Sequence, residues 1–329
     1  MKNSYFLYYQ LWLMLGLGNI LPAQSLPYTS FNLLRLPNSA TAIALGGVQV
    51  SSALPEPSMI TQNPALLQPE AARRASLSVQ PWYADILHSQ VAVALPRGER
   101  AALGLWVQYL HYGTIPDTDP GGQTQGDFQA ADWSIGAAYS HRLGVFRLGG
   151  SVQILGSHIA GYGQYALAGT LGGVFRHPDR DFQLGLTIAN IGAGLGGDAA
   201  IAPLPLELRL GASFKPQHMP LRFHFTLRHL PNAMPPVPTE LSGNAVSSAL
   251  RFMVLGAELL PHKNFGLMIG YNPLVRQTLR PSERAGSSGV FGGFRLHTRK
   301  FQLNYARGAL HPAGGRNTLT LTLDWEHLL

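Results

Sequence analysis

The sequence of 329 residues contains no cysteine and few charged residues. Without cysteine there can be no disulfide framework, no thiol nucleophile and no cysteine-based zinc site. Charged residues make up 12% of the chain, about half the share of roughly 25% in globular domains. Hydrophobic residues still reach 46%, which argues against disorder. The composition also argues against an ordinary soluble α/β enzyme, whose surface helices carry many Glu and Lys. The net charge is +7, but the basic residues form no run, so we expect no nucleic-acid partner.

The first 23 residues read as a secretory signal peptide. Lys2 precedes a mostly apolar stretch from Tyr5 to Leu21, and Pro22-Ala23-Gln24 follows. A short positive region, an apolar core and a small residue at the end are typical of export signals. We therefore expect residues 1–23 to be removed after Ala23; a single membrane anchor is the alternative.

Long apolar runs are missing after residue 24, and strict alternation is present instead. Leu221, Phe223, Phe225 and Leu227, for example, alternate with Arg222, His224, Thr226 and Arg228. A period of two places one set of side chains on each face of a sheet. About fourteen such runs occur, most near the ~9–11 residues that a tilted membrane strand needs. They lie at 75–83, 88–95, 101–112, 131–140, 144–156, 164–176, 181–190, 205–214, 221–230, 250–260, 264–271, 288–297, 299–307 and 317–327.

The connections between the runs alternate in length. Short ones are Pro96–Arg100, His141–Leu143, His177–Arg180, Lys215–Pro220, Pro261–Lys263 and Thr298. Long ones are Gly113–Ala130, Ile191–Leu204, Pro231–Ala249, Asn272–Ser287 and Gly308–Arg316. Short periplasmic turns that alternate with long outer loops are typical of outer-membrane barrels. The predicted fold class is therefore all-β: a transmembrane antiparallel β-barrel of about 14 strands over residues 75–329, with 12 or 16 strands left open.

Residues 24–74 lack sustained alternation and are expected to form a plug or hatch inside the barrel. A barrel of about fourteen strands is wider than the eight-stranded kind that side chains fill unaided. Ser39 to Leu45 is the expected helix, with Ser39 as its N-cap and Gly46-Gly47 as its end. The alternative is a disordered periplasmic tail.

Positive charge gathers in the short turns. These turns and their flanks hold nine basic residues: Arg97, Arg100, Arg142, Arg176, Arg180, Lys215, Lys263, Arg299 and Lys300. Only Glu99, Asp179 and Asp181 oppose them. The predicted periplasmic rim is therefore basic, which reflects either ordinary turn chemistry or a rim that faces a partner or a phosphate.

Motifs for catalysis, metals and cofactors are weak, and we expect no such site. Gly192-Ala-Gly-Leu-Gly-Gly197 has the letters of a dinucleotide motif, but Pro203 and Pro205 precede a strand where a helix is required. His224 and His229 fall on opposite faces of one run, which is unsuited to joint metal ligation. Five charged residues on the predicted lumen side indicate an interior polar network or a plug anchor, with substrate contact as the alternative: Glu207, Arg209, Arg222, His224 and Arg228.

Two N-terminal motifs resemble a known family. The stretch from Phe31 to Val48, FNLLRLPNSATAIALGGV, resembles the pattern FxFLxLPxSARxAALGG, and Asn63–Leu67 resembles the element NPALL. Both are similar to the PorV/PorQ family of type IX secretion-system outer-membrane proteins, whose fold is like that of the fatty-acid transporter FadL. Further matches favour the PorQ members: Asn190-Ile191-Gly192, Gly270–Leu274 with Arg276, Tyr305–Arg307 and His311–Gly315. Thr41 in place of Arg, and Leu329 in place of a terminal aromatic residue, depart from the family's pattern.

The resemblance implies a function that composition does not reveal. Proteins of the PorQ type are scaffolds of the attachment complex, which removes the signal of secreted cargo and links cargo to lipopolysaccharide. The chain would then hold a PorZ-like surface protein and, through it, the sortase-like PorU and PorV. Its partner surfaces would be the outer loops Gly113–Ala130, Pro231–Ala249 and Asn272–Ser287. The alternatives are a FadL-like transporter of hydrophobic molecules, a PorV-like carrier of cargo signals and an envelope enzyme.

Overall fold

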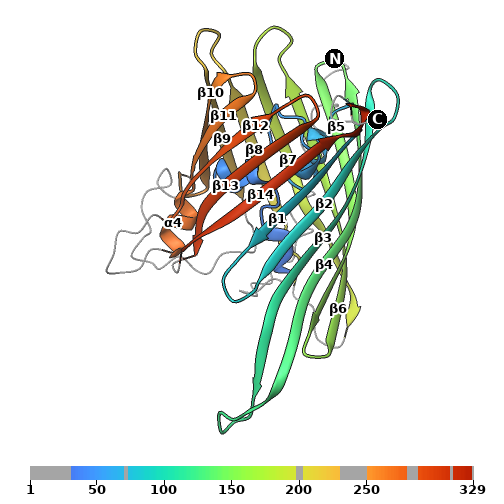
Figure 1. Cartoon of the computed structure of the whole chain (residues 1–329). Coiled ribbons are helices and arrows are strands. Elements are labelled where there is room, and N and C mark those ends of the chain that lie inside the picture. Colours follow the sequence, from blue (N-terminus) through green and yellow to red (C-terminus); the bar gives the residue numbers. More distant parts are fainter. Residues whose placement is uncertain are drawn as a thin grey trace, which may run out of the picture.

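The chain forms one closed antiparallel barrel of fourteen strands around an N-terminal plug (Figure 1). The computed structural model describes residues 31–69, 73–197, 203–229, 250–279, 288–311 and 314–327. The predicted signal peptide and the predicted loop Pro231–Ala249 lie outside these residues. No helix within the described ranges is long and apolar enough to cross a membrane.

Each strand pairs with its sequence neighbours, and β1 closes the barrel on β14. All fourteen predicted runs are strands: β1 (Arg74–Pro81), β2 (Leu87–Pro96), β3 (Ala101–Thr118), β4 (Thr124–Leu143), β5 (Phe146–Ile159), β6 (Tyr162–Arg176), β7 (Phe182–Gly197), β8 (Glu207–Phe214), β9 (Leu221–His229), β10 (Met253–His262), β11 (Phe265–Tyr271), β12 (Val290–His297), β13 (Phe301–His311) and β14 (Gly314–Asp324).

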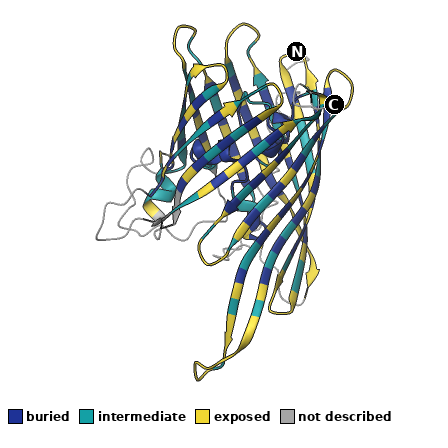
Figure 2. Cartoon of the chain, in the orientation of Figure 1, coloured by how far each residue is buried: buried dark blue, intermediate teal, exposed yellow. Residues whose placement is uncertain are grey.

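The outer face of the wall is an apolar belt and the inner face is polar. Leu77 pairs with Val91, and the same row continues through Val107, Ile135 and Ile154. These five side chains are 46–54% exposed, as expected of residues that face lipid. Their inward neighbours in the same strands, such as Ser78, Gln90 and Gln108, are buried (Figure 2). The fold therefore has the surface that a membrane barrel requires.

The two ends of the barrel differ in shape. The turns between even and following odd strands are short and lie together at the top of Figure 1. At the opposite end, the β3–β4 hairpin extends farthest, so the prediction of a loop at Gly113–Ala130 is wrong. There the strands stay paired from Thr114↔Gln129 to Thr118↔Thr124. The sequence of this hairpin does not alternate between apolar and polar residues, because both of its faces are exposed to solvent. Such alternation indicates that one face of a strand is buried, and it does not indicate whether the strand is paired.

Three further predicted loops also contain regular structure. Residues 191–197 of the expected Ile191–Leu204 loop continue β7, and most of Gly308–Arg316 belongs to β13 and β14. Asn272–Ser287 includes helix α4 (Pro273–Leu279). The predicted turn His141–Leu143 is the end of β4, and the short turn follows it at residues 144–145.

Residues 31–69 fold inside the barrel as a series of short helices. These are η2 (Asn32–Arg35), α2 (Ala40–Ala44), η3 (Pro57–Thr61) and η4 (Pro64–Leu66). The predicted helix is confirmed: the Ser39 side chain accepts a hydrogen bond from the backbone N–H of Thr41. Gly46 and Gly47 follow with φ of 102° and 94°, a left-handed region that favours glycine. The plug thus begins and ends its one α-helix with the residues that the sequence indicated.

Glycines on the inner wall let the plug backbone touch the barrel. A Cβ on Gly149 would lie 2.5 Å from the backbone nitrogen of Ala65, and one on Gly185 would lie 2.0 Å from the carbonyl oxygen of Val50. At Gly270 the distance to the Gly46 nitrogen would be 2.3 Å. No real side chain fits at such distances. The wall glycines are therefore part of the plug's binding surface.

We predict that Gly149→Ala destabilises the protein, whereas Gly150→Ala does not. The added methyl of Gly149→Ala meets plug backbone and costs about 1–3 kcal/mol of overpacking. Gly150, the next residue of β5, has only an ordinary 3.7 Å contact with Leu171. Urea unfolding of both variants in detergent micelles measures the difference. Equal unfolding midpoints would contradict this account of the wall glycines.

Candidate functional site

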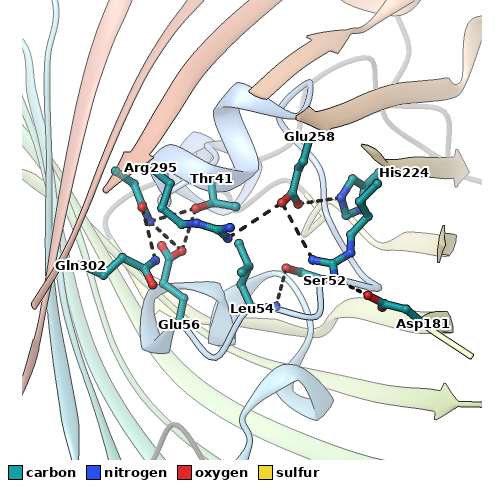
Figure 3. A network of polar contacts seen from close by, with 11 residues as sticks. Thr41, Ser52, Leu54, Glu56, Asp181, His224, Glu258, Arg295 and Gln302 are labelled. Carbon is teal, nitrogen blue, oxygen red and sulfur yellow. Dashed lines mark hydrogen bonds and ion pairs between the residues drawn. The ribbon is translucent and has the colours of Figure 1, made fainter. Parts of the chain in front are cut away.

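A buried carboxylate, Glu56, joins the plug to the barrel wall. Its oxygens accept hydrogen bonds from Ser39 Oγ at 2.5 Å, Thr41 Oγ1 at 2.7 Å and Ser58 Oγ. From β13, the amide of Asn304 donates to the same carboxylate at 3.0 Å. Glu56 thus ties α2, η3 and the wall together at one point (Figure 3). Thr41, which stands where the resembled motif has Arg, fits this site because its hydroxyl supplies one of these donors.

A second buried carboxylate, Glu258 on β10, is surrounded by basic side chains from β9 and β12. His224 Nε2 lies 2.7 Å from Glu258 Oε1, and since a carboxylate accepts, this nitrogen carries the proton. Arg222 and Arg295 lie 3.9 and 3.8 Å from the other oxygen. Arg222 also pairs with Asp181 at 2.6 Å, which extends the group to the short-turn end (Figure 3).

A third buried carboxylate, Glu207 on β8, is held by two arginines. Arg209 Nη2 lies 2.7 Å from one oxygen and Arg228 Nε lies 2.5 Å from the other. Arg209 also donates through Nη1 to the carbonyl of Gln62 in the plug at 3.3 Å. Buried charges are tolerated when they are paired and hydrogen-bonded, and removing one partner is costly. Glu56 and the Glu207–Arg209 pair therefore join the plug to the wall directly, whereas the partners named here for Glu258 are wall residues.

The lumen network predicted from the sequence is confirmed, but it is divided between two carboxylates. Glu207 pairs with Arg209 and Arg228, whereas Glu258 pairs with Arg222 and His224. The sequence analysis missed Glu258, Arg295, Glu56 and Asn304. Glu258 could have been found, because it lies four residues after Val254 in the same run. Residues an even number apart in a strand face the same side of the sheet, and here that side is the lumen. Glu56 could not, because it lies in an aperiodic Pro-rich stretch.

Wall side chains also satisfy the backbone of the plug. Thr320 Oγ1 accepts from the N–H of Ala40 at 3.0 Å, and Asn272 Nδ2 donates to the carbonyl of Gly46 at 2.9 Å. Ser140 and Ser213 donate to the carbonyls of Leu67 and Ser51 at 2.5 and 2.6 Å. Buried backbone groups need such partners. The plug is thus bonded to strands around most of the barrel.

The cavity between η2 and the wall is small and largely polar. Its volume is about 20 Å³, and Arg35, Gln108, Gln153 and Arg209 are among its lining residues. A space of this size holds about one water molecule. This part of the lumen therefore has no room for a hydrophobic ligand.

A bulge interrupts β7 beside the plug. Gly169 pairs with Ile191 but Leu171 pairs with Ile188, so β7 has one extra residue there. Asn190 takes a φ of 64°, and its Nδ2 donates to the carbonyl of Pro205 at 2.9 Å. Next to it Phe31, Leu155, Ala166, Ala168 and Leu204 form a buried apolar cluster. A bulge that interrupts a strand beside the plug is the local feature expected where a barrel wall opens sideways toward the lipid. Here the side chain of Asn190 bridges the bulge to Pro205.

The other motifs singled out in the sequence do not form sites. Residues 192–197 lie in the exposed outer end of β7, in a strand and not at the start of a helix. Among the described residues, no group of three or more His, Asp or Glu side chains is arranged to hold a metal ion.

Comparison with known proteins identifies the fold. No protein-family model matches the sequence, and no curated protein is detectably similar to it. Similar solved structures include a mutant of the TodX monoaromatic hydrocarbon channel, with a TM-score of 0.57 and 13% identity over 89% of this chain and 98% of that one. The Ralstonia pickettii toluene transporter TbuX gives 0.52 and 12%, over 88% and 97%. A Pseudomonas aeruginosa FadL homologue gives 0.50 and 11%, over 88% and 98%.

These matches cover nearly the whole of each structure, so the fold is that of the FadL-like outer-membrane barrels. A closed fourteen-stranded barrel with an apolar belt belongs in the bacterial outer membrane. Its short-turn end is the periplasmic end, and the β3–β4 hairpin is on the outer side.

We predict that Glu56→Ala loosens the plug. Several buried hydroxyl and amide donors lose their acceptor, and a buried donor left unsatisfied costs about 1–3 kcal/mol. The measurements are urea unfolding in micelles and single-molecule conductance in a planar lipid bilayer, where we expect a lower unfolding midpoint and a higher conductance. Glu326→Ala is the matched control, because Glu326 pairs with Arg73 at the exposed surface. An unchanged midpoint and conductance would show that Glu56 does not hold the plug.

Proposed function

We propose that the chain is an outer-membrane scaffold of the type IX attachment complex, of the PorV/PorQ kind, which holds a PorZ-like surface protein. Through this partner it would meet the sortase-like PorU and PorV, at the site where cargo is linked to lipopolysaccharide. The N-terminal resemblance supports this proposal, because its motif residues form the plug. Ser39 caps α2, Gly46 and Gly47 end it, and Asn63 caps η4 while its amide donates to the carbonyl of Val50.

The projecting β3–β4 hairpin is the observation that carries the proposal. Its strands have 18 and 20 residues, whereas crossing a membrane takes about 9–11. At ~3.3 Å per residue, the five residues from Thr114 to Thr118 extend the wall by roughly 15 Å. Most residues between 114 and 129 are exposed. A transport pore has no need for such an arm, but a scaffold that grips a partner outside the membrane does.

The charge of the hairpin suggests the chemistry of that partner. Its outer part contains Asp117, Asp119 and Asp127 and no Lys or Arg. The whole chain is positively charged, so this acidic tip stands apart from the rest. We therefore expect the partner surface that meets the tip to be basic, since complementary charge steers association.

A FadL-like channel is the second candidate, and the bulge at Asn190 favours it. Two of the similar structures are named as a monoaromatic hydrocarbon channel and a toluene transporter. Against this candidate, the cavity beside the plug holds about one water and Asn190 is hydrogen-bonded across the bulge. A PorV-like carrier of cargo signals would use the same outer surfaces, and the partner recovered with the chain distinguishes it from the scaffold.

We predict that shortening the hairpin removes the partner but not the barrel. In the shortened variant Asn-Gly replaces residues 115–128. A tight two-residue turn then connects the cross-strand partners Thr114 and Gln129. Affinity purification from the native host, with mass spectrometry, should recover a PorZ-like protein with the full chain and lose it with the short one. The control is Tyr162→Ala, an exposed residue at the neighbouring β5–β6 turn that should leave recovery unchanged. Equal recovery with the short hairpin would rule out the hairpin as the gripping surface.

We also predict that cells with the chain take up toluene no faster than cells without it. The plug is bonded to the wall, and the bulge is bridged by Asn190. Uptake of radiolabelled toluene or fatty acid measures this directly. Fast uptake that disappears when Asn190 is deleted, so that β7 pairs without a bulge, would instead make the channel the leading function.

A further inference from the structure

A cleft at the periplasmic end lies between two of the short turns. It has a volume of about 710 Å³ and lies between the β6–β7 turn, residues 177–181, and the β8–β9 turn, residues 215–220. The backbone N–H of Lys215 donates to the carbonyl of Asp181 at 2.8 Å and joins the two turns. Arg222 holds the Asp181 side chain at 2.6 Å. The cleft is therefore built by contacts between its own walls.

Aromatic rings on the lipid-facing side form one part of this cleft. Phe182 and Phe214 are cross-strand partners whose neighbours Gln183 and Ser213 face the lumen and are buried. The Phe214 ring lies 5.3 Å from that of Phe223 and is stacked at 6.2 Å on Phe225. Phe182 begins β7 and Phe214 ends β8, where the membrane meets the periplasm, and Phe223 and Phe225 lie within the first five residues of β9. They offer an apolar platform at the depth of lipid headgroups and upper acyl chains.

Cationic groups form the other part. Arg180 and Lys215 line the cleft and are close in the chain to Phe182 and Phe214; the lining also contains His177 and His218. The His177 Nδ1 accepts from the backbone N–H groups of Asp179 and Arg180, both at 3.1 Å, so the ring proton resides on Nε2. Asp181 is the one acidic residue of the lining, and its carboxylate is already paired with Arg222.

We propose that this cleft binds the phosphate headgroup of an anionic phospholipid from the periplasmic leaflet of the membrane. Arg180 and Lys215 would contact the phosphate, and Phe182 and Phe214 would contact the glycerol and the first carbons of the chains. Basic pockets at the membrane surface bind anionic headgroups, because their positive charge attracts the headgroup and lies at the same depth in the membrane. A free phosphate would use the cations alone, so the aromatic platform favours the lipid. The inference is independent of the proposed scaffold function.

Native mass spectrometry of the purified full chain tests this site. Detergent micelles are doped with phosphatidylglycerol, with phosphatidylcholine, or with inorganic phosphate alone. We expect the protein to retain phosphatidylglycerol and to retain phosphatidylcholine at least tenfold more weakly, which is the order of magnitude expected when two cations attract an anionic headgroup. We also expect that millimolar inorganic phosphate does not displace the lipid. Equal retention of both lipids, or displacement by inorganic phosphate, would overturn the proposal.

Variants locate the site. Arg180→Glu with Lys215→Glu should lower retention of phosphatidylglycerol by roughly tenfold or more, because two attractive charges become repulsive. Arg180→Gln with Lys215→Gln should give a smaller loss in the same direction, and it keeps the test valid if the reversed pair fails to fold. The control is Arg97→Glu with Arg100→Glu in the β2–β3 turn, whose two flanking strands contain no phenylalanine. If the control loses as much lipid as the Arg180 and Lys215 variants, the lipid responds to the total positive charge of the periplasmic rim. That result would refute a specific site in this cleft.

Discussion

The structure depends on one constraint, that no backbone N–H or C=O can remain unpaired inside lipid. A β-sheet meets this constraint only when it closes, and β1 pairs with β14 over Arg74–Val79 to do so. Closure with fourteen strands creates a lumen that wall side chains do not fill. Residues 31–69 occupy it, and most of their side chains are buried. The plug is thus a consequence of the barrel's width.

The plug packs against the wall partly through buried apolar clusters, such as the one that joins Ile43 to Met268 and Phe291, and partly through closer and more directional contacts. Glycines at positions such as 149 and 185 bring plug and wall backbones into contact. Buried carboxylates then provide directional bonds: Glu56 from the plug bonds to Asn304, and Glu207 from the wall holds Arg209, which donates to the carbonyl of Gln62. Since an unpaired buried charge is costly, each of these groups favours one position of the plug over others.

The two ends of the barrel are specialised in opposite ways. The outer end extends through the acidic β3–β4 hairpin, which offers a surface to macromolecules outside the membrane. The periplasmic end is short and basic, with phenylalanine rings at the strand ends next to Arg180 and Lys215. Opposite charge on the outer β3–β4 hairpin and on the periplasmic turns is consistent with a protein whose position in the membrane matters as much as its interior.

The sequence alone predicted the barrel, a count of about fourteen strands, the helix after Ser39 and the lumen-facing positions of charged residues such as Glu207 and Arg222, because a lipid-facing outside and a polar inside leave a period of two. The tertiary structure alone decided how far β3 and β4 extend, since a hairpin exposed on both faces has no period. It also decided that Glu56 meets Asn304, 248 residues away, and that Phe182 and Phe214 lie below two basic turns. Such contacts depend on where closure of the barrel brings distant strands together, and no local pattern in the chain encodes that distance.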